Sequence, residues 1–276
     1  MRVTHLDCGP MRPPGGRLLD GKPGVFRSAE FVCHVLLIES EDGLVLVDTG
    51  FGLSDLANPP GSLPPLFAKM IRPIPDPDNA AISRITALGY DPSDVRHIIL
   101  THLDLDHAGG LPDFPDARVH VYAPEHQAAM TRKSRAERDR YRPAQWAHGP
   151  KWEIHTPQEG GDEWFGFNAV RTLTGLPEDF LLVPLPGHTQ GHTGIAVRTE
   201  TGWLLHAGDA YFTHTEMNQP PSCPPLLRAF ESQAQMNAQA RHTNQNRLRD
   251  LVKTHSPEVT VFSAHDATEL ARLTTS

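Results

Sequence analysis

Short runs of valine, isoleucine and leucine, bounded by glycine, proline or aspartate, recur along both halves of the chain and predict β-strands. The expected strands span residues 2–8, 31–40, 43–50, 95–100, 117–123, 179–185, 193–199, 202–209 and 258–266. Helical spacing of apolar residues lies between them, at 78–89, 123–141 and 228–255. This alternation predicts packed layers of helices and sheets, an α/β fold, in place of an all-β sandwich.

Two irregular segments interrupt the alternation, at about 53–78 and 143–178. The first is rich in proline and the second in tryptophan and phenylalanine, and both carry large apolar side chains. Segments of this kind often cover a pocket, although a loop docked on the surface fits the pattern equally well. No linker is visible, so we expect residues 1–276 to form a single domain.

Composition narrows the classes of function. The chain has 276 residues, a net charge of −8 and a pI near 6.0. No run of lysine and arginine stands out, so we expect no nucleic-acid partner. No window is apolar enough to span a membrane, and the first residues lack the apolar core of a secretory signal. Cys8, Cys33 and Cys223 have no paired spacing, so we expect buried thiols, no disulfides and a cytoplasmic location.

The stretch THLDLDHAGG, at 101–110, gathers histidines and aspartates directly after an expected strand. In extended backbone, His102 and Asp104 point to the same side. A turn into a helix would swing Asp106 and His107 toward the same volume, because the small residues that follow permit a tight turn. Without a cation, so many carboxylates and imidazoles would repel one another or need protons. The cluster therefore predicts a metal site more strongly than a solvated polar loop.

Further titratable residues end apolar runs downstream. His188 lies in PLPGHTQGHTG, Asp209 closes WLLHAGD, and His265 closes VTVFSAHD. Sites in layered folds collect at the ends of strands. Any one of these residues alone would be an ordinary turn residue, but together they indicate one shared site.

The ordered motifs HLDLDHAGG, PGHTQGHT, HAGD and SAHD resemble the metallo-β-lactamase superfamily, and VLVDTGFG at 45–52 matches its early strand and turn. Within that superfamily the pattern is most similar to quorum-quenching N-acyl homoserine lactonases. The resemblance spans about residues 31 to 266. It implies an αββα sandwich of two mixed β-sheets with metals at one edge.

The resemblance also implies roles for individual residues. One divalent metal would be held by His102, Asp104 and His188, a second by Asp106, His107 and His265, and both by Asp209. Asp48 would support these ligands from behind. From its place in GHTQGHTG, His192 is either a second supporting residue that orients a ligand or a structural histidine. Asp106 would also pass a proton to the leaving group. Tyr211 would stabilise the oxyanion, although a difference of one residue in spacing leaves Phe212 as the alternative.

Asp104 departs from the usual HxHxDH pattern, in which a second histidine stands at that place. Two divalent ions balanced by Asp104, Asp106, Asp209 and a hydroxide would leave a formally neutral site, one charge less positive than the all-histidine version. Zinc is the first expectation, and a carboxylate also favours iron or manganese. Flavodiiron proteins carry a carboxylate there, but this chain has no flavodoxin-like segment after the sandwich. The alternative is that Asp104 abolishes one site and leaves a single metal.

These features predict a metal-dependent hydrolase of a lactone or ester-like small molecule, with N-acyl homoserine lactones as the leading substrates. Phosphotriester hydrolysis is the alternative reaction, because the same site can polarise a P=O group. A non-catalytic ligand-binding regulator on the same fold is the alternative from another class. The sequence does not decide whether the segment at 13–30 is an arm that builds a homodimer or a loop docked on its own chain.

Overall fold

The computed structural model describes residues 1–156, 163–168 and 173–275. Its largest sheet contains six strands in the order β1-β2-β3-β4-β5-β6. They are β1 (Arg2–Asp7), β2 (His34–Ser40), β3 (Gly43–Val47), β4 (Val95–Ile99), β5 (Arg118–Tyr122) and β6 (Lys151–His155). Neighbours are antiparallel from β1 to β3 and parallel from β3 to β6, so the sheet is mixed.

The second sheet has the order β12-β11-β10-β9 and is also mixed, because β11 and β12 are parallel while the other pairs are antiparallel. Its strands are β9 (Phe180–Pro184), β10 (Thr193–Thr199), β11 (Gly202–His206) and β12 (Val259–Phe262). Strands β7 (Glu163–Trp164) and β8 (Phe167–Asn168) form a separate two-stranded sheet.

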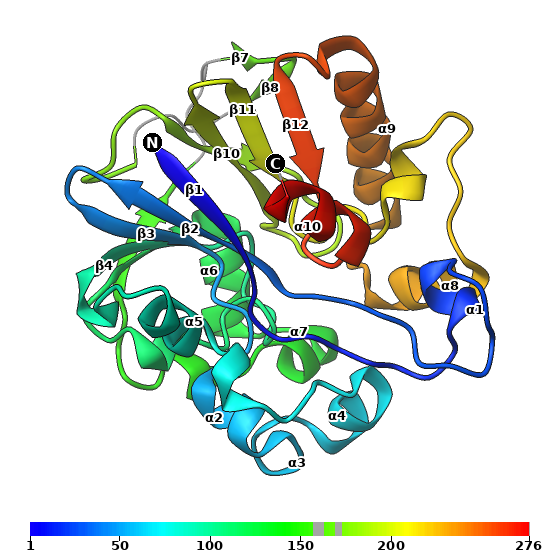
Figure 1. Ribbon diagram of the computed structural model, residues 1–276, viewed down its shortest axis with the longest axis horizontal. Helices are drawn as coiled ribbons and strands as arrows, with labels where there is room; N and C mark the ends of the chain where they lie inside the picture. Colours follow the sequence, from blue (N-terminus) through cyan, green and yellow to red (C-terminus); the bar gives the residue numbers. More distant parts are fainter. Residues whose placement is uncertain (157–162, 169–172, 276) are drawn as a thin grey trace.

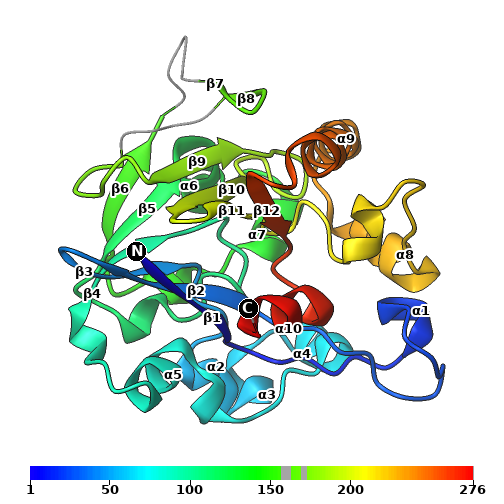
Figure 2. The same cartoon turned by 45° about the horizontal axis from the view of Figure 1, so that its top comes forward.

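Alternation of side chains along the strands divides the core into layers, as β2 shows. Leu36 and Ile38 join a cluster with Phe180 and Ile195 of the second sheet, which is the core between the sheets. The intervening side chains of β2 point the other way, into a cluster that includes Ile85 of helix α5. The outer face of the second sheet packs in the same way against α9. The expected αββα sandwich of two mixed sheets is therefore confirmed (Figures 1 and 2).

The helices cover the outer faces of the sheets and build the surface around one sheet edge (Figure 1). They are α1 (Arg17–Asp20), α2 (Leu53–Ala57), α3 (Pro59–Ser62), α4 (Pro65–Ile71), α5 (Ala81–Ala87), α6 (Ala123–Thr131), α7 (Arg135–Arg140), α8 (Pro225–Ala234), α9 (Ala238–His255) and α10 (Ala267–Thr274). Single 3₁₀ turns lie at Pro77–Asn79, Pro92–Asp94, Leu111–Asp113, Pro143–Trp146 and His214–Met217. Across the described ranges, no helix combines the length and apolar character that a membrane span requires.

The helix expected at 123–141 is two helices, so that prediction was wrong in its extent. Arg132 takes a left-handed conformation with φ of 42°, which ends α6. Ser134 then begins α7 with a capping box, because its hydroxyl accepts from the backbone N–H of Glu137 while the Glu137 carboxylate accepts from the N–H of Ser134. The break turns Arg140, at the end of α7, toward the sheet edge.

The helix expected at 228–255 is also divided. The chain is extended at Gln235, and the side chain of Asn237 accepts from the N–H of Ala240 at 3.0 Å to begin α9. Asparagine competes for backbone donors and favours this position over a helix interior. Helical spacing alone did not reveal either break.

The first irregular segment is docked structure, and so is the described part of the second, whose residues 157–162 and 169–172 lie outside the described residues. The first folds into α2, α3 and α4, and Phe67 packs against the cluster that contains Phe51 and Leu105. In the second, Trp146 and Trp164 are buried in the cores on the outer faces of the two sheets. Their large apolar side chains are therefore mostly explained by packing.

Three buried histidines form a chain across neighbouring parallel strands of the first sheet. His97 Nδ1 lies 2.8 Å from His120 Nε2, and His120 Nδ1 lies 2.9 Å from His155 Nε2. Burial, reinforced by both neighbouring histidines and by Arg118, lowers the pKa of His120 to about 3. Burial also lowers the pKa of His97 and of His155. His120 lies between two imidazoles and must be neutral to donate one hydrogen bond and accept the other.

We predict that this row of three histidines lowers the stability of the protein in acid. Unfolded histidine binds a proton below about pH 6.5, whereas folded His120 stays neutral down to about pH 3, so stability falls as the pH drops through that window. Between pH 7 and pH 5 the contribution of His120 to the free energy of unfolding should fall by about 2 kcal/mol. Urea unfolding at both pH values should show a smaller loss in His120→Gln than in the wild type. An equal loss in both proteins would contradict the account.

Candidate metal centre

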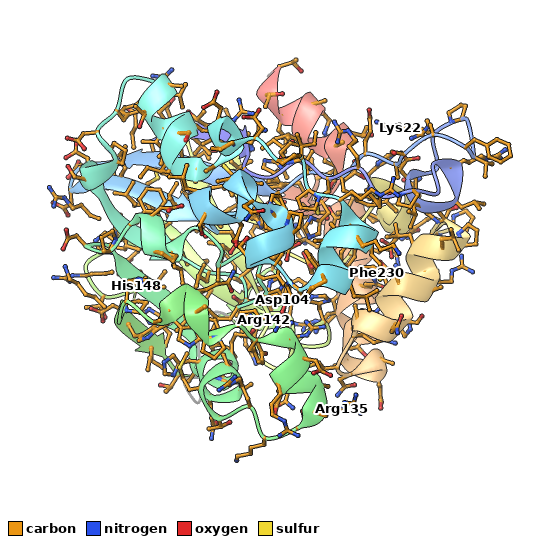
Figure 3. All side chains as sticks on the ribbon, turned by 90° about the horizontal axis from the view of Figure 1, so that it is seen from below. Lys22, Asp104, Arg135, Arg142, His148 and Phe230 are labelled. Atoms are coloured by element: carbon orange, nitrogen blue, oxygen red, sulfur yellow. The ribbon has the colours of Figure 1, made fainter. Side chains whose placement is uncertain are left out.

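Residues from both sheets meet at one edge of the sandwich, where strands end. His102 and its neighbours follow β4, and Asp209 and His265 follow β11 and β12. His188 lies in the loop between β9 and β10. In Figure 3, Asp104 lies near the centre of the view, between Arg142, which follows α7, and Phe230 of α8. The carboxyl ends of strands from both sheets thus bring together residues that are far apart in sequence.

Asp209 lies at the centre of the cluster, and its two oxygens face different pairs of histidines. Oδ2 lies 3.3 Å from His188 Nε2 and 3.8 Å from His102 Nε2. Oδ1 lies 3.2 Å from His107 Nε2 and 3.1 Å from His265 Nε2. A single carboxylate therefore lies between two separate sets of imidazoles.

A further carboxylate accompanies each pair of histidines. Asp104 Oδ2 lies 3.0 Å from His188 Nε2 and 3.4 Å from His102 Nε2. Asp106 Oδ2 lies 3.7 Å from His265 Nε2. The structure thus brings all seven of the residues proposed as metal ligands into one cluster. The buried thiol of Cys33, expected only as a small apolar group, also lies with Asp106 and His265, since their potential ligand atoms are within 4.8 Å of one another.

Hydrogen bonds behind the cluster aim the histidine rings. His107 Nδ1 donates to Asp48 at 2.8 Å, and His265 Nδ1 donates to the carbonyl of Val32 at 2.7 Å. The Thr101 hydroxyl donates to Asp48 at 2.7 Å, so it accepts from His102 Nδ1 at 2.9 Å. With the proton on Nδ1, each of these rings presents the lone pair of Nε2 to the interior of the cluster. Metal-binding histidines are held in this way.

Several inward atoms have no hydrogen-bond partner among the described residues. They are Nε2 of His102, Oδ1 of Asp104 and Oδ1 of Asp209, all buried. Buried polar atoms are costly unless they are paired, and nitrogen and oxygen lone pairs are the ligands of zinc, iron and manganese. The donor set therefore fits divalent cations.

The charges of the cluster also favour binding of a cation. Burial would raise the pKa of Asp209, but His265, His107 and His188 outweigh it and hold the pKa well below the usual range. Burial would lower the pKa of His107, but Asp209 and Asp48 raise it well above the usual range. The carboxylates thus attract positive charge to the interior of the cluster.

Asp48 supports the centre from behind, as expected. It adopts a left-handed backbone conformation with φ of 57°, which is uncommon for a residue other than glycine. In that conformation its carboxylate accepts from the Thr101 N–H at 2.8 Å as well as from the Thr101 hydroxyl and His107. One carboxylate therefore fixes the backbone that follows β4 and two of the histidine rings.

His192 also supports the centre, as expected. Its Nε2 accepts from the backbone N–H of Asp209 at 2.9 Å, while its Nδ1 donates to the carbonyl of Leu185 at 3.0 Å. It thus fixes the backbone of the central carboxylate. Gly208 is required beside it, because a Cβ there would lie 2.5 Å from His192 Nε2 and φ is 54°.

Glu125 is a supporting residue that sequence reasoning missed. Its buried carboxylate accepts from the N–H of Leu103 at 2.9 Å, the Tyr141 hydroxyl at 3.1 Å, the Thr189 hydroxyl at 2.6 Å and the N–H of Gly191 at 3.2 Å. It thereby joins the two loops that carry His102 and His188. No motif in the sequence indicated this role, because Glu125 lies in an ordinary first helical turn.

The catalytic role expected for Tyr211 is not supported by its position. Its hydroxyl donates to the carboxylate of Glu269, with oxygen–oxygen distances of 3.1 and 3.2 Å, inside the core of the second sheet. Phe212 is the neighbour that lies at the cluster, where its ring stacks on His265 with centroids 5.2 Å apart. Successive residues in extended backbone point to opposite sides, so a difference of one position exchanges their roles.

Arg140 is a second residue that sequence reasoning missed. Its Nη1 donates to Asp104 Oδ2 at 2.9 Å. Burial would raise the pKa of Asp104, but Arg140, followed by His102, outweighs it and holds the pKa well below the usual range. The helical spacing expected at 123–141 did not point to Arg140, because the break between α6 and α7 is not visible in the pattern.

A family model described as the metallo-beta-lactamase superfamily matches residues 29–265. The chain belongs to this superfamily. It is a metallo-β-lactamase-fold hydrolase, and proteins of this superfamily generally bind divalent metals. The resemblance inferred from the motifs is confirmed.

Named relatives give the comparison more detail. A probable metallo-hydrolase of Mycobacterium tuberculosis is 42% identical over 266 residues, 96% of this chain and 80% of the relative. The N-acyl homoserine lactonase AiiA of Bacillus thuringiensis is 26% identical over 88% of this chain and 84% of the relative. A crystal structure of AiiA with N-decanoyl-L-homoserine bound at the active site shares the fold, with a TM-score of 0.71, 22% identity, and coverage of 98% of this chain and 95% of that one.

We predict that Asp48→Asn weakens metal binding although Asp48 is outside the proposed ligand set. The amide would present N–H groups to donors that now meet a carboxylate, so His107 and Thr101 would lose their orientation. Zinc affinity, measured by competition with a chelator, should fall roughly 10- to 100-fold. Asp116→Asn, at an exposed ion pair with Lys151, is the control and should bind like the wild type. Unchanged affinity in Asp48→Asn would show that the hydrogen bonds behind the cluster are dispensable.

Proposed function

We propose that this hydrolase opens the ring of a lactone, with N-acyl homoserine lactones as its substrate class. The observation that carries the proposal is the position of Asp209, whose two oxygens each face a different pair of histidines. This is the arrangement needed to hold two cations on either side of one carboxylate. Hydrolysis of an ester by water is the chemistry that such a pair supports.

The proposed ligands follow the two halves of the cluster. His102, Asp104 and His188 would hold one cation, Asp106, His107 and His265 the other, and Asp209 both. Zinc is the proposed metal, with iron or manganese accepted because of Asp104. Bound there, divalent cations lower the pKa of water and polarise a carbonyl oxygen.

Asp106 is the residue we assign to proton transfer. Its side chain is 14% exposed, and no hydrogen bond or ion pair other than the 3.7 Å approach to His265 engages it among the described residues. Attack by water releases a proton and ring opening leaves an alkoxide that needs one, so a carboxylate at the edge of the cluster can take the first proton and pass it to the alkoxide. Asp104 has similar exposure but is already bound by Arg140.

A small hollow of about 20 Å³ adjoins the cluster at His265. Phe31, Phe212 and Leu19 contribute apolar wall, and Lys22 lies on its rim. The irregular segments that the sequence offered as a pocket cover do not supply its described lining, which comes from the N-terminal segment and from residues after β11 and β12. Space of this size holds about one water molecule, so the hollow marks a way to His265 and does not select among substrates.

The relatives support the substrate class. Those named N-acyl homoserine lactonases are 26% to 29% identical to this chain, whereas the relative at 42% identity is named only as a probable metallo-hydrolase. The alternative substrate class, a phosphotriester, is the comparison substrate in the experiment below.

We predict that zinc-loaded protein hydrolyses N-hexanoyl homoserine lactone with kcat/KM on the order of 10⁴ M⁻¹ s⁻¹ or more, and a p-nitrophenyl phosphotriester far more slowly. Acid release in a weakly buffered indicator assay measures ring opening. Asp106→Asn should lower kcat roughly 100-fold or more, because the leaving alkoxide loses its proton donor.

Tyr211→Phe is the matched control, since its hydroxyl lies on Glu269 and its loss should leave kcat within about threefold of the wild type. Absence of turnover on every lactone and ester in protein carrying two metals would overturn the proposal and favour a ligand-binding regulator. Preferential turnover of the phosphotriester would replace the lactone as the substrate.

A further inference from the structure

The ion pair between Asp104 and Arg140 connects the metal centre to two helices outside the motifs. Arg140 is the last residue of α7, and its Nη1 donates to Asp104 Oδ2 at 2.9 Å. Its Nη2 donates to the carbonyl of Ala234, the last residue of α8. Carbonyls at the end of a helix lack helical partners and carry partial negative charge, so a guanidinium suits this place.

The guanidinium is held on both sides and is nearly withdrawn from solvent. Its side chain is 13% exposed, and that of Asp104 is 16% exposed. Because each terminal nitrogen of Arg140 donates to a fixed acceptor, the guanidinium is held in place and is not free to turn toward a substrate. Its position instead fixes the carboxylate it contacts.

The two oxygens of Asp104 have different surroundings. Oδ2 receives Arg140 and faces His188 and His102, whereas Oδ1 is buried and has no hydrogen-bond partner among the described residues. A planar guanidinium restricts rotation of the carboxylate it binds. Arg140 therefore holds Asp104 with Oδ2 toward the two histidines, while Oδ1 has no hydrogen bond to the described residues.

The pair also restores a charge balance. A carboxylate in place of a neutral imidazole makes this half of the cluster one charge more negative, and the guanidinium cancels that charge. The site with Arg140 thus has the same formal charge as one with histidine at position 104. The neutral centre expected from the sequence alone is corrected, because that count omitted Arg140.

We propose that Arg140 is a positioning residue of the metal centre, and that Asp104 and Arg140 together replace the histidine found at this place in the HxHxDH pattern. The proposal rests on the dinuclear ligand assignment made above, but not on the identity of the substrate. The arginine orients and neutralises the aspartate, which then binds the cation that His102 and His188 also hold. Neither residue is expected to perform this role without the other.

A double-mutant cycle tests whether the two residues act as a unit. The four proteins are the wild type, Arg140→Gln, Asp104→His, and Asp104→His with Arg140→Gln. Zinc per chain is counted by elemental analysis after dialysis, and the two zinc affinities are measured by competition with a chelator. No substrate enters the measurement, so its result is independent of the lactonase proposal.

Arg140→Gln should weaken one of the two zinc sites roughly 10- to 100-fold, because Asp104 loses orientation and balance. Asp104→His should also weaken it, because the buried guanidinium then faces an imidazole. The double variant should return to within about threefold of the wild type. Arg135→Gln, at the exposed start of the same helix and well away from Asp104 in Figure 3, should leave both affinities unchanged.

Arg140→Lys is a second variant for the case in which Arg140→Gln does not fold. Because it keeps the positive charge, its affinity for the more weakly bound zinc should be at least tenfold higher than that of the Asp104→His single variant. Two undiminished zinc affinities in Arg140→Gln would overturn the proposal. Zinc affinity in the double variant no higher than in either single variant would also overturn it. If Arg140 only linked α7 to α8, histidine at position 104 would not restore the affinity.

Discussion

The carboxylate of Asp209 is the interaction on which the rest of this structure depends. It follows β11 of the second sheet, yet its Oδ1 lies 3.2 Å from His107, which follows β4 of the first sheet. With the Nε2 lone pairs of the histidines turned toward them, the buried oxygens of Asp209 are unfavourably placed unless a cation or a proton lies between. The edge where the two sheets meet is therefore suited to cations, and the two sheets must keep their relative position for the centre to form.

Three buried groups hold that edge in register. Asp48 fixes the segment that follows β4, Glu125 joins that segment to the loop of His188, and His192 fixes the backbone of Asp209. Each uses hydrogen bonds to backbone N–H groups as well as to side chains, so ligand geometry is tied to the main chain. Preorganisation of this kind makes a metal site independent of fluctuations in its own side chains.

Runs of apolar residues predicted the strands, and motifs that resemble the superfamily implied the sandwich and the seven residues of the cluster. Arg140 and Glu125 were missed because they reach the centre through tertiary contacts. The helix break that aims Arg140 begins at a left-handed residue, Arg132. Tyr211 and Phe212 were not separated because adjacent residues differ only in the side they face. Spacing predicts which segment approaches a site, whereas packing decides which of its side chains enters.

The most direct test of the account is anomalous X-ray diffraction from crystals grown with zinc. Two peaks are predicted within one cluster, each about 2.0 to 2.2 Å from its ligands, the first at His102, Asp104 and His188 and the second at Asp106, His107 and His265, with Asp209 touching both. A single peak, or zinc bound elsewhere while these side chains stay as they are, would contradict the claim that Asp209 holds two cations between the sheets.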